Sequence, residues 1–304
     1  MPDSDKKIKH FIFSRFFTYQ RVGFPYNVLE VDFLSKQLPL VKNMLKSLEN
    51  QTSKNFELIF LTNPEFFYDP KYEFIFSTLR SYTVLPINFI KFTGDTLSYQ
   101  DSKVKGLWKF KENKNVELGN LIASALNDYD FVITTKMDFD DFVFKDAVID
   151  TQSKVNECNS ILAYGYNKGL EYIYGELYPR TDFLWKGRGH IGIFQSLILK
   201  SSSVENYPFL SVQNFWHDCI KIQLEQFLKN NGIEFLKDMF QQNFSTCAYI
   251  YLRHEFSQEH LVKSRGKPLQ SKVSKQPPLT AKYITKEQLK SDFGFDGYEL
   301  NSIK

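Results

Sequence analysis

This chain of 304 residues has few cysteines, little net charge and no long apolar run. Its three cysteines are odd in number, widely spaced and without a CxxC pair, which argues against a disulfide framework or a zinc site and favours a reducing compartment. A net charge of +3 is too small to indicate nucleic-acid binding. No run approaches the roughly 20 apolar residues of a membrane span, and the N-terminal segment lacks an apolar stretch of the signal-peptide type. We therefore expect a cytoplasmic protein.

Glycine-rich phosphate-binding loops are also missing. A dinucleotide-binding fold needs a Gly-rich turn after its first strand, but this sequence has Ser14-Arg15-Phe16-Phe17 there, and no GxxxxGK[ST] loop occurs. Any phosphate group must therefore be bound through a metal ion or through side chains. Aromatic residues are abundant instead, with 30 Phe and 17 Tyr, and we expect them to fill much of the core.

The spacing of apolar residues predicts that strands and helices alternate over residues 9–137. Strands are expected to start near Lys9, Phe56, Val84 and Phe131, and helices to cover residues 33–48 and 117–126. This alternation predicts an α/β fold with a mostly parallel sheet covered by helices on both faces. Further along the chain, the pattern predicts a helix over 218–229 and a short helix over 283–294.

Three carboxylates stand directly after the buried strand that residues 131–137 predict. They are Asp138, Asp140 and Asp141. Ligands bind at strand ends in open α/β sheets, and carboxylates crowded there need a compensating cation because they repel one another and lose solvation. Oxygen ligands suit a hard divalent ion, so the sequence predicts Mg²⁺ or Mn²⁺, which would in turn hold a substrate phosphate.

Other interpretations of the acidic cluster require other residues around it. A solvated acidic turn remains open, since most short acidic runs are of that kind. A calcium loop starting at Asp138 is excluded, because its fifth, sixth and twelfth positions are Phe142, Val143 and Ile149 instead of an oxygen ligand, Gly and Glu. A phosphatase-type aspartyl motif is excluded by Phe142 as well.

The segment Thr134-Thr-Lys-Met-Asp138-Phe-Asp140-Asp141, after this order of strands and helices, resembles the nucleotide-sugar glycosyltransferases of the GT-A fold. It is most similar to the bacterial rhamnosyltransferase-like family, whose members carry Thr-Thr-Arg-Leu-Asp-x-Asp-Asp. The segments 45–60 and 251–254 are similar to that family too. The resemblance covers residues 9–150 well and 155–262 loosely, and it implies a GT-A-like fold with a C-terminal helical or irregular extension.

The resemblance also implies roles for individual residues. Asp138 and Asp140 would orient a metal-bound nucleotide diphosphate, with Asp141 as a further ligand or a supporting anchor. Arg15 and the region of Asn63 would lie near the base and ribose. Lys136 stands where the family tends to have Arg, and Lys keeps the charge but lacks the bidentate fork that suits a phosphate.

Sugar transfer by inversion needs a general base that takes the proton of the acceptor hydroxyl. Asp218 is the candidate base, although an Asp at a helix start is equally the usual N-cap. His217 is the reserve base, with a partly buried structural histidine as the alternative. His254 is a candidate ligand of the metal or diphosphate, or else an ordinary surface histidine. Arg188, in a basic and Gly-containing segment, is a candidate phosphate contact or part of a solvated loop.

The sequence thus predicts a metal-dependent glycosyltransferase of the hexosyl or deoxyhexosyl type, inverting, with a nucleotide-sugar donor and a bacterial surface polysaccharide or related glycan as acceptor. We expect a domain over 1–262, divided into a nucleotide-sugar-binding half (9–141) and an acceptor-binding half (142–262). A basic, Pro-containing tail (263–304) would follow and leaves peripheral contact with the inner membrane open. Two other classes stay open: a non-catalytic glycan-binding module, and a metal-dependent phosphotransferase or nucleotidyltransferase.

Overall fold

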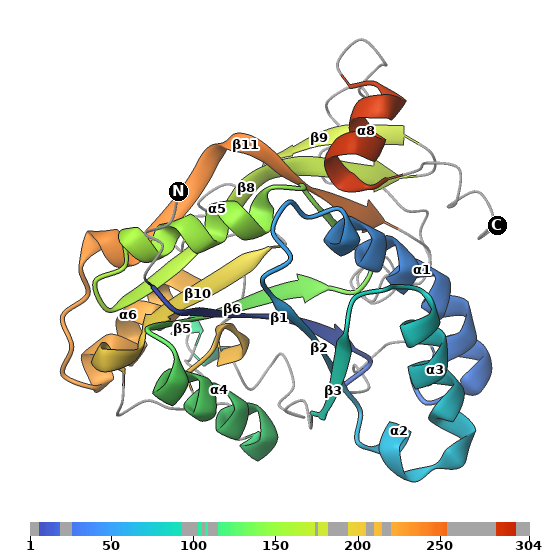
Figure 1. The fold of residues 1–304 in the computed structure, drawn as a ribbon, viewed down its shortest axis with the longest axis horizontal. Helices are drawn as coiled ribbons and strands as arrows, with labels where there is room; N and C mark the ends of the chain where they lie inside the picture. The colour runs from blue at the N-terminus through green and yellow to red at the C-terminus, as the bar shows by residue number, and fades with distance from the viewer. Residues whose placement is uncertain are drawn as a thin grey trace.

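The structure is a computed structural model that describes most of the chain, with gaps. The described residues are 6–18, 26–92, 103–104, 107–108, 115–173, 176–181, 194–204, 210–214, 220–253 and 284–295. They form three layers, in which α1, α3 and α5 cover one face of a central sheet and α4 and α6 cover the other (Figure 1). The helices are α1 (Val31–Glu49), α2 (Glu65–Tyr68), α3 (Glu73–Ser81), α4 (Val116–Asp128), α5 (Ala147–Ser153), α6 (Ile220–Asn230) and α8 (Lys286–Phe293).

The central sheet has nine strands within the described residues, in the order β3-β2-β1-β6-β10-β8-β11-β7, with β9 paired to β8. Their bounds are β1 (Ile8–Phe16), β2 (Glu57–Thr62), β3 (Ile87–Lys91), β6 (Phe131–Asp138), β7 (Phe142–Val143), β8 (Ile161–Ile173), β9 (Glu176–Thr181), β10 (Gln195–Lys200) and β11 (Phe240–Arg253). A separate pair is formed by β4 (Lys103–Val104) and β5 (Leu107–Trp108).

The sheet is mixed, and more of its paired residues lie in parallel than in antiparallel ladders. Strands β3, β2, β1 and β6 run parallel to one another, as do β8 and β11. Strands β7, β9 and β10 pair antiparallel with their neighbours. The predicted α/β fold with a mostly parallel sheet flanked by helices is therefore confirmed.

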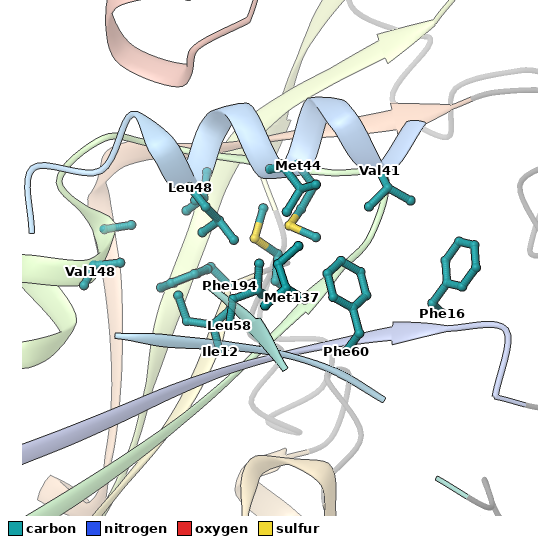
Figure 2. Close-up of a cluster of buried hydrophobic side chains, with 14 of the residues drawn as sticks. Ile12, Phe16, Val41, Met44, Leu48, Leu58, Phe60, Met137, Val148 and Phe194 are labelled. Atoms are coloured by element: carbon teal, nitrogen blue, oxygen red, sulfur yellow. The ribbon is translucent and has the colours of Figure 1, made fainter. Parts of the chain in front are cut away.

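Strand β6 lies between β1 and β10 in the sheet, and all its residues except Asp138 are buried, as a strand covered by two helix layers requires. Helix α1 covers one of these faces. Figure 2 shows Val41, Met44 and Leu48 of α1 above Ile12 of β1 and Met137 of β6. The opposite face is closed by apolar residues of α4 and α6, among them Leu118, Ile122, Leu224 and Leu228.

The helix predictions over residues 33–48 and 117–126 are confirmed by α1 and α4. The one over 218–229 is confirmed by α6 from Ile220 onward, and its first two residues lie outside the described ranges. Helix α4 begins where the Asn115 side chain accepts a hydrogen bond from the Leu118 backbone N–H at 3.0 Å. The third strand was predicted too early: it begins at Ile87, and Val84 is 92% exposed in the turn before it. None of the helices that the structure describes is long and apolar enough to span a membrane.

The short C-terminal helix predicted over 283–294 is α8, and it packs on the sheet. Thr285 forms a capping box with Gln288, and Gly294 ends the helix in the left-handed region at φ 66°. Phe295 meets the ring of Phe142 with centroids 4.8 Å apart, and Lys145 forms an ion pair with Asp292 at 3.0 Å. The rest of the tail predicted over 263–282 lies outside the described residues, and the division into 1–262 and 263–304 stays a prediction.

A line of buried polar side chains crosses the face of the sheet that α1 and α5 cover. His10 Nε2 lies 2.7 Å from Thr135 Oγ1, which lies 2.7 Å from Ser196 Oγ, so that β1, β6 and β10 are joined. The other ring nitrogen of His10 lies 3.5 Å from the side-chain nitrogen of Gln152. Burial lowers the pKa of His10 from 6.5 to about 3, because the charged imidazolium would lose its hydration.

The buried His10 makes the protein less stable in acid. Between pH 6.5 and about 3 the unfolded chain binds a proton at His10 that the folded chain does not, so stability falls as the pH falls through this window. From pH 7 to pH 5 the contribution of His10 falls by about 2 kcal/mol. Urea unfolding of the native chain and of His10→Gln at both pH values measures this difference. An equal loss of stability in the two proteins would show that His10 is not the group responsible.

Candidate functional site

The C-terminal ends of β1 and β6 lie side by side at the centre of the sheet (Figure 1). The parallel register pairs Arg15 with Asp138. Arg15 Nη2 is 3.9 Å from Asp138 Oδ1, and the two side chains are 32% and 48% exposed. An ion pair this long and this open to solvent adds little stability. The two charges are therefore available to a ligand at this edge.

The turn after β6 holds the acidic cluster in place through an aromatic side chain. Phe139 stands between Asp138 and Asp140 in the sequence. Its ring contacts those of Phe16 and Phe17, with centroids 5.4 and 5.2 Å away. Phe17 has a φ of 45°, in the left-handed region that residues with a large side chain rarely adopt. This strained backbone follows β1 directly and turns an aromatic ring toward Phe139. Asp138 and Asp140 remain partly exposed on either side of it in sequence.

Asp141 differs from the other two carboxylates because it is fully buried. Its Oδ1 accepts a hydrogen bond from the backbone N–H of Leu252 on β11 at 3.1 Å. The neighbouring Phe142 and Val143 form β7, which pairs with β11. Asp141 therefore ties the acidic turn to the opposite part of the sheet, which is the geometry of a supporting anchor.

The sheet face covered by α4 and α6 changes from apolar to polar at this end. Side chains on one face of a strand recur at every second residue. On this face the four adjacent strands read Phe11, Phe13, Arg15 in β1; Val132, Thr134, Lys136, Asp138 in β6; Leu199, Leu197, Gln195 in β10; and Ile161, Ala163, Gly165, Asn167 in β8. All four strands lose their apolar residues at the same edge, where the core gives way to a candidate binding surface.

Three polar side chains of this edge are buried. Lys136 is 6% exposed, its register partner Gln195 is 1% exposed, and Asn167 is 0% exposed. Considering the described part of the chain, neither oxygen nor nitrogen of the Gln195 and Asn167 amides has a hydrogen-bond partner. A buried polar group left without a partner costs about 1–3 kcal/mol. Sequence reasoning missed both amides, because only the strand register shows that Gln195 lies beside Lys136 and that Asn167 lies on the next strand, β8.

Asn63 follows β2, whose end lies beside that of β1 in the parallel register. Its side-chain oxygen accepts the backbone N–H of Glu65 at 3.0 Å, which shapes the first turn of α2. The structure thus places Asn63 at the same edge of the sheet as Arg15. The predicted residues Arg188, His217, Asp218 and His254 lie outside the described residues, and their roles stay predictions.

The described residues contain no group of three or more His, Cys, Asp or Glu side chains arranged to hold a metal ion. Mg²⁺ does not require such a group, because it is commonly held by one or two carboxylates together with substrate phosphates and water. Asp138 and Asp140 provide two partly exposed carboxylates in one turn, and this donor set fits a hard cation.

Comparison with solved structures finds weak likenesses to several transferases. A protein of Desulfovibrio desulfuricans G20, provisionally assigned as a nucleotide-diphospho-sugar transferase, is 12% identical over 82% of this chain and 83% of its own, with a TM-score of 0.38. Mouse xyloside xylosyltransferase 1 is 9% identical over 78% of this chain and 85% of its own, with a TM-score of 0.37. S. aureus TarS is 11% identical over 81% of this chain, with a TM-score of 0.35. The match covers only 37% of the length of TarS.

Likenesses at these identities and scores do not assign an activity to this chain. Comparison with protein-family models and with curated proteins found no match to the sequence. The function is therefore inferred from the arrangement at the ends of β1 and β6.

The roles of Asp141 and Asp138 can be separated by stability. Asp141→Ala removes the acceptor of the Leu252 N–H inside the protein, so we expect the free energy of unfolding to fall by about 1–3 kcal/mol. Asp138→Ala removes a partly exposed carboxylate with one long ion pair, so we expect a change within about 0.5 kcal/mol. Urea unfolding of both variants at pH 7 measures the difference. Equal losses would contradict the anchoring role of Asp141.

Proposed function

We propose that this protein is a metal-dependent glycosyltransferase that uses a nucleotide-sugar donor. The observation that carries the proposal is the pairing of Arg15 with Asp138 at the carboxyl ends of two parallel strands, with Asp140 two residues further along the turn after β6. Open α/β sheets bind ligands at this edge, and a cation beside two exposed carboxylates suits a diphosphate with its metal ion. The sequence offers no glycine-rich loop that could bind the phosphates in another way.

Each group has a defined task in the proposal. Asp138 and Asp140 would hold Mg²⁺ or Mn²⁺, and the bound ion would supply positive charge against the leaving diphosphate. Arg15, beside Asp138, offers its N–H donors to a phosphate oxygen. Asn63, at the end of the adjacent β2, lies on the side of β1 where the nucleoside is placed.

The remaining features come from the sequence and are part of the proposal. Asp218, with His217 in reserve, takes the proton of the acceptor hydroxyl, so that transfer proceeds with inversion. The phosphates are contacted by Arg188 and Lys136, and the metal or the diphosphate is bound by His254. The acceptor is a bacterial surface polysaccharide or a related glycan, and the enzyme works in the cytoplasm, with peripheral contact to the inner membrane through the basic segment 263–282. Weak likenesses to sugar transferases agree with this class, and the proposal does not depend on them.

Thermal unfolding with a panel of nucleotides tests the donor site. A ligand that binds only the folded protein raises its stability, and at 100 times the Kd the melting temperature should rise by about 5 °C. We expect one of UDP, GDP and dTDP to give such a shift, with CMP as the weak-binding comparison, and only when Mn²⁺ is present. Asp140→Asn should lose the shift while melting at the same temperature as the native chain without ligand.

Asp128→Asn is the matched control, since Asp128 is an exposed carboxylate at the end of α4, where the chain leads into the start of β6. It should keep the full nucleotide shift. If no nucleotide shifts the native chain, the transferase proposal is wrong and a glycan-binding module becomes the better hypothesis. With a bound nucleotide identified, the reaction products decide the chemistry: a free nucleoside diphosphate means sugar transfer, whereas pyrophosphate or a phosphorylated acceptor means phospho- or nucleotidyl transfer.

A further inference from the structure

The polar edge of the sheet continues beyond the carboxylates to two side-chain amides. Gln195 lies on β10, and its register partner on β6 is Lys136, two residues before Asp138. Strand β10 also pairs antiparallel with β8, where Ser196 lies opposite Tyr164. Gln195 and Asn167 project from the other face of these strands, because each is an odd number of residues from that pair. They are therefore diagonal neighbours on the face that carries Lys136 and Asp138.

The burial of these two amides lowers the stability of the fold, because within the described residues their polar atoms have no hydrogen-bond partners. Gln195 and Asn167 are 1% and 0% exposed, and within the ranges that the structure describes their oxygens and nitrogens have no hydrogen-bond partner. A well-packed apolar side chain would serve the core better at either position. Unmet hydrogen-bonding groups of this kind, at the polar edge of an otherwise apolar face, indicate a ligand that supplies donors and acceptors in pairs.

The chemistry and position of the amides suit a sugar. Each carboxamide offers two N–H donors and an oxygen acceptor, which matches neighbouring hydroxyl groups that both donate and accept. Neighbouring strands lie about 5 Å apart, so Gln195 is about 5 Å and Asn167 about 10 Å to one side of β6. Arg15 and Asn63, on β1 and after β2, lie on the other side of β6. A diphosphate held at Asp138 would thus have its nucleoside on one side and one sugar ring on the other.

We propose that Gln195 and Asn167 bind the hydroxyl groups of the transferred sugar and so help to select the donor. This inference rests on the proposed function, because the diphosphate at Asp138 determines where the sugar lies. It assigns sugar selection to β8 and β10, whereas the nucleotide is bound at the ends of β1, β2 and β6.

The test compares each nucleoside diphosphate with its sugar derivative by titration calorimetry in the presence of Mn²⁺. The pairs are UDP with UDP-glucose and UDP-galactose, GDP with GDP-mannose, and dTDP with dTDP-rhamnose. We expect the native chain to bind at least one nucleotide sugar about tenfold more tightly than the bare diphosphate, as one or two net hydrogen bonds provide. Gln195→Met and Asn167→Leu keep the side-chain size. Each should remove the preference for the nucleotide sugar over the bare diphosphate, while the affinity for the bare diphosphate stays within about twofold of the native value.

Gln37→Met is the matched control for the loss of a buried amide. Gln37 lies on α1, which covers the opposite face of the sheet, is 0% exposed, and among the described residues its amide likewise has no hydrogen-bond partner. All three variants should melt at or above the temperature of the native chain, because each removes an unmet polar group. Only the variants at positions 195 and 167 should change the preference for the sugar derivative.

Three results would overturn the inference. Lower melting temperatures for Gln195→Met and Asn167→Leu than for Gln37→Met would show that the two amides serve the fold. An unchanged ratio of diphosphate to nucleotide-sugar affinity, or a change confined to the KM for a glycan acceptor, would remove the donor sugar from these residues while leaving the proposed function intact. Failure of the native chain to bind any nucleotide or nucleotide sugar would reject the inference together with the proposed function.

Discussion

The parallel pairing of β1 with β6 is the constraint on which the rest of the structure depends. It extends from Ile8 opposite Phe131 to Arg15 opposite Asp138, and both strands are buried between two helix layers. Because the strands are parallel, their carboxyl ends reach the same edge, and an arginine and an aspartate 123 positions apart in the chain become neighbours. A shift of one residue in this register would put Arg15 and Asp138 on opposite faces of the sheet.

Polar side chains are buried on both faces of the sheet, but at different places. Under α1 and α5, His10, Thr135 and Ser196 form a continuous line of polar contacts that joins three strands. Gln37 on α1 is also buried on that side, and among the described residues its amide has no hydrogen-bond partner. Under α4 and α6 the apolar pattern stops at one edge, and Gln195 and Asn167 are buried there, at the edge that carries Arg15 and Asp138. Their position at this edge, and not the missing partner alone, distinguishes them from Gln37.

Much of the fold could be predicted from the sequence, and the reason is local. Helices α1, α4 and α6 have apolar residues at helical spacing, and β2 and β6 are short apolar runs ended by polar residues. The position of the acidic cluster at the end of β6 could also be predicted, because the three carboxylates directly follow this apolar run in the sequence. The start of β3 was misplaced because Val84 is apolar but lies in an exposed turn, and apolar character alone does not distinguish the two.

The candidate site was only partly predictable because its geometry depends on distant pairings. Sequence spacing treats Asp138, Asp140 and Asp141 alike, whereas the third is buried against β11 through a partner 111 residues away. Gln195 and Asn167 lie on β10 and β8, and no local pattern shows that these strands are neighbours or which face each amide takes. Register between strands far apart in sequence is set by tertiary packing, which a single sequence does not reveal.

The bond between Asp141 and the Leu252 backbone N–H also sets an order on folding during synthesis. Strand β6 and its acidic turn leave the ribosome long before β11 is made, and α8, which packs on Phe142, is made later still. Until β11 is made, the backbone N–H of Leu252 that Asp141 accepts in the folded protein is missing. The acidic turn can therefore be anchored to β11 only after translation has passed residue 252, through a contact between residues far apart in the chain.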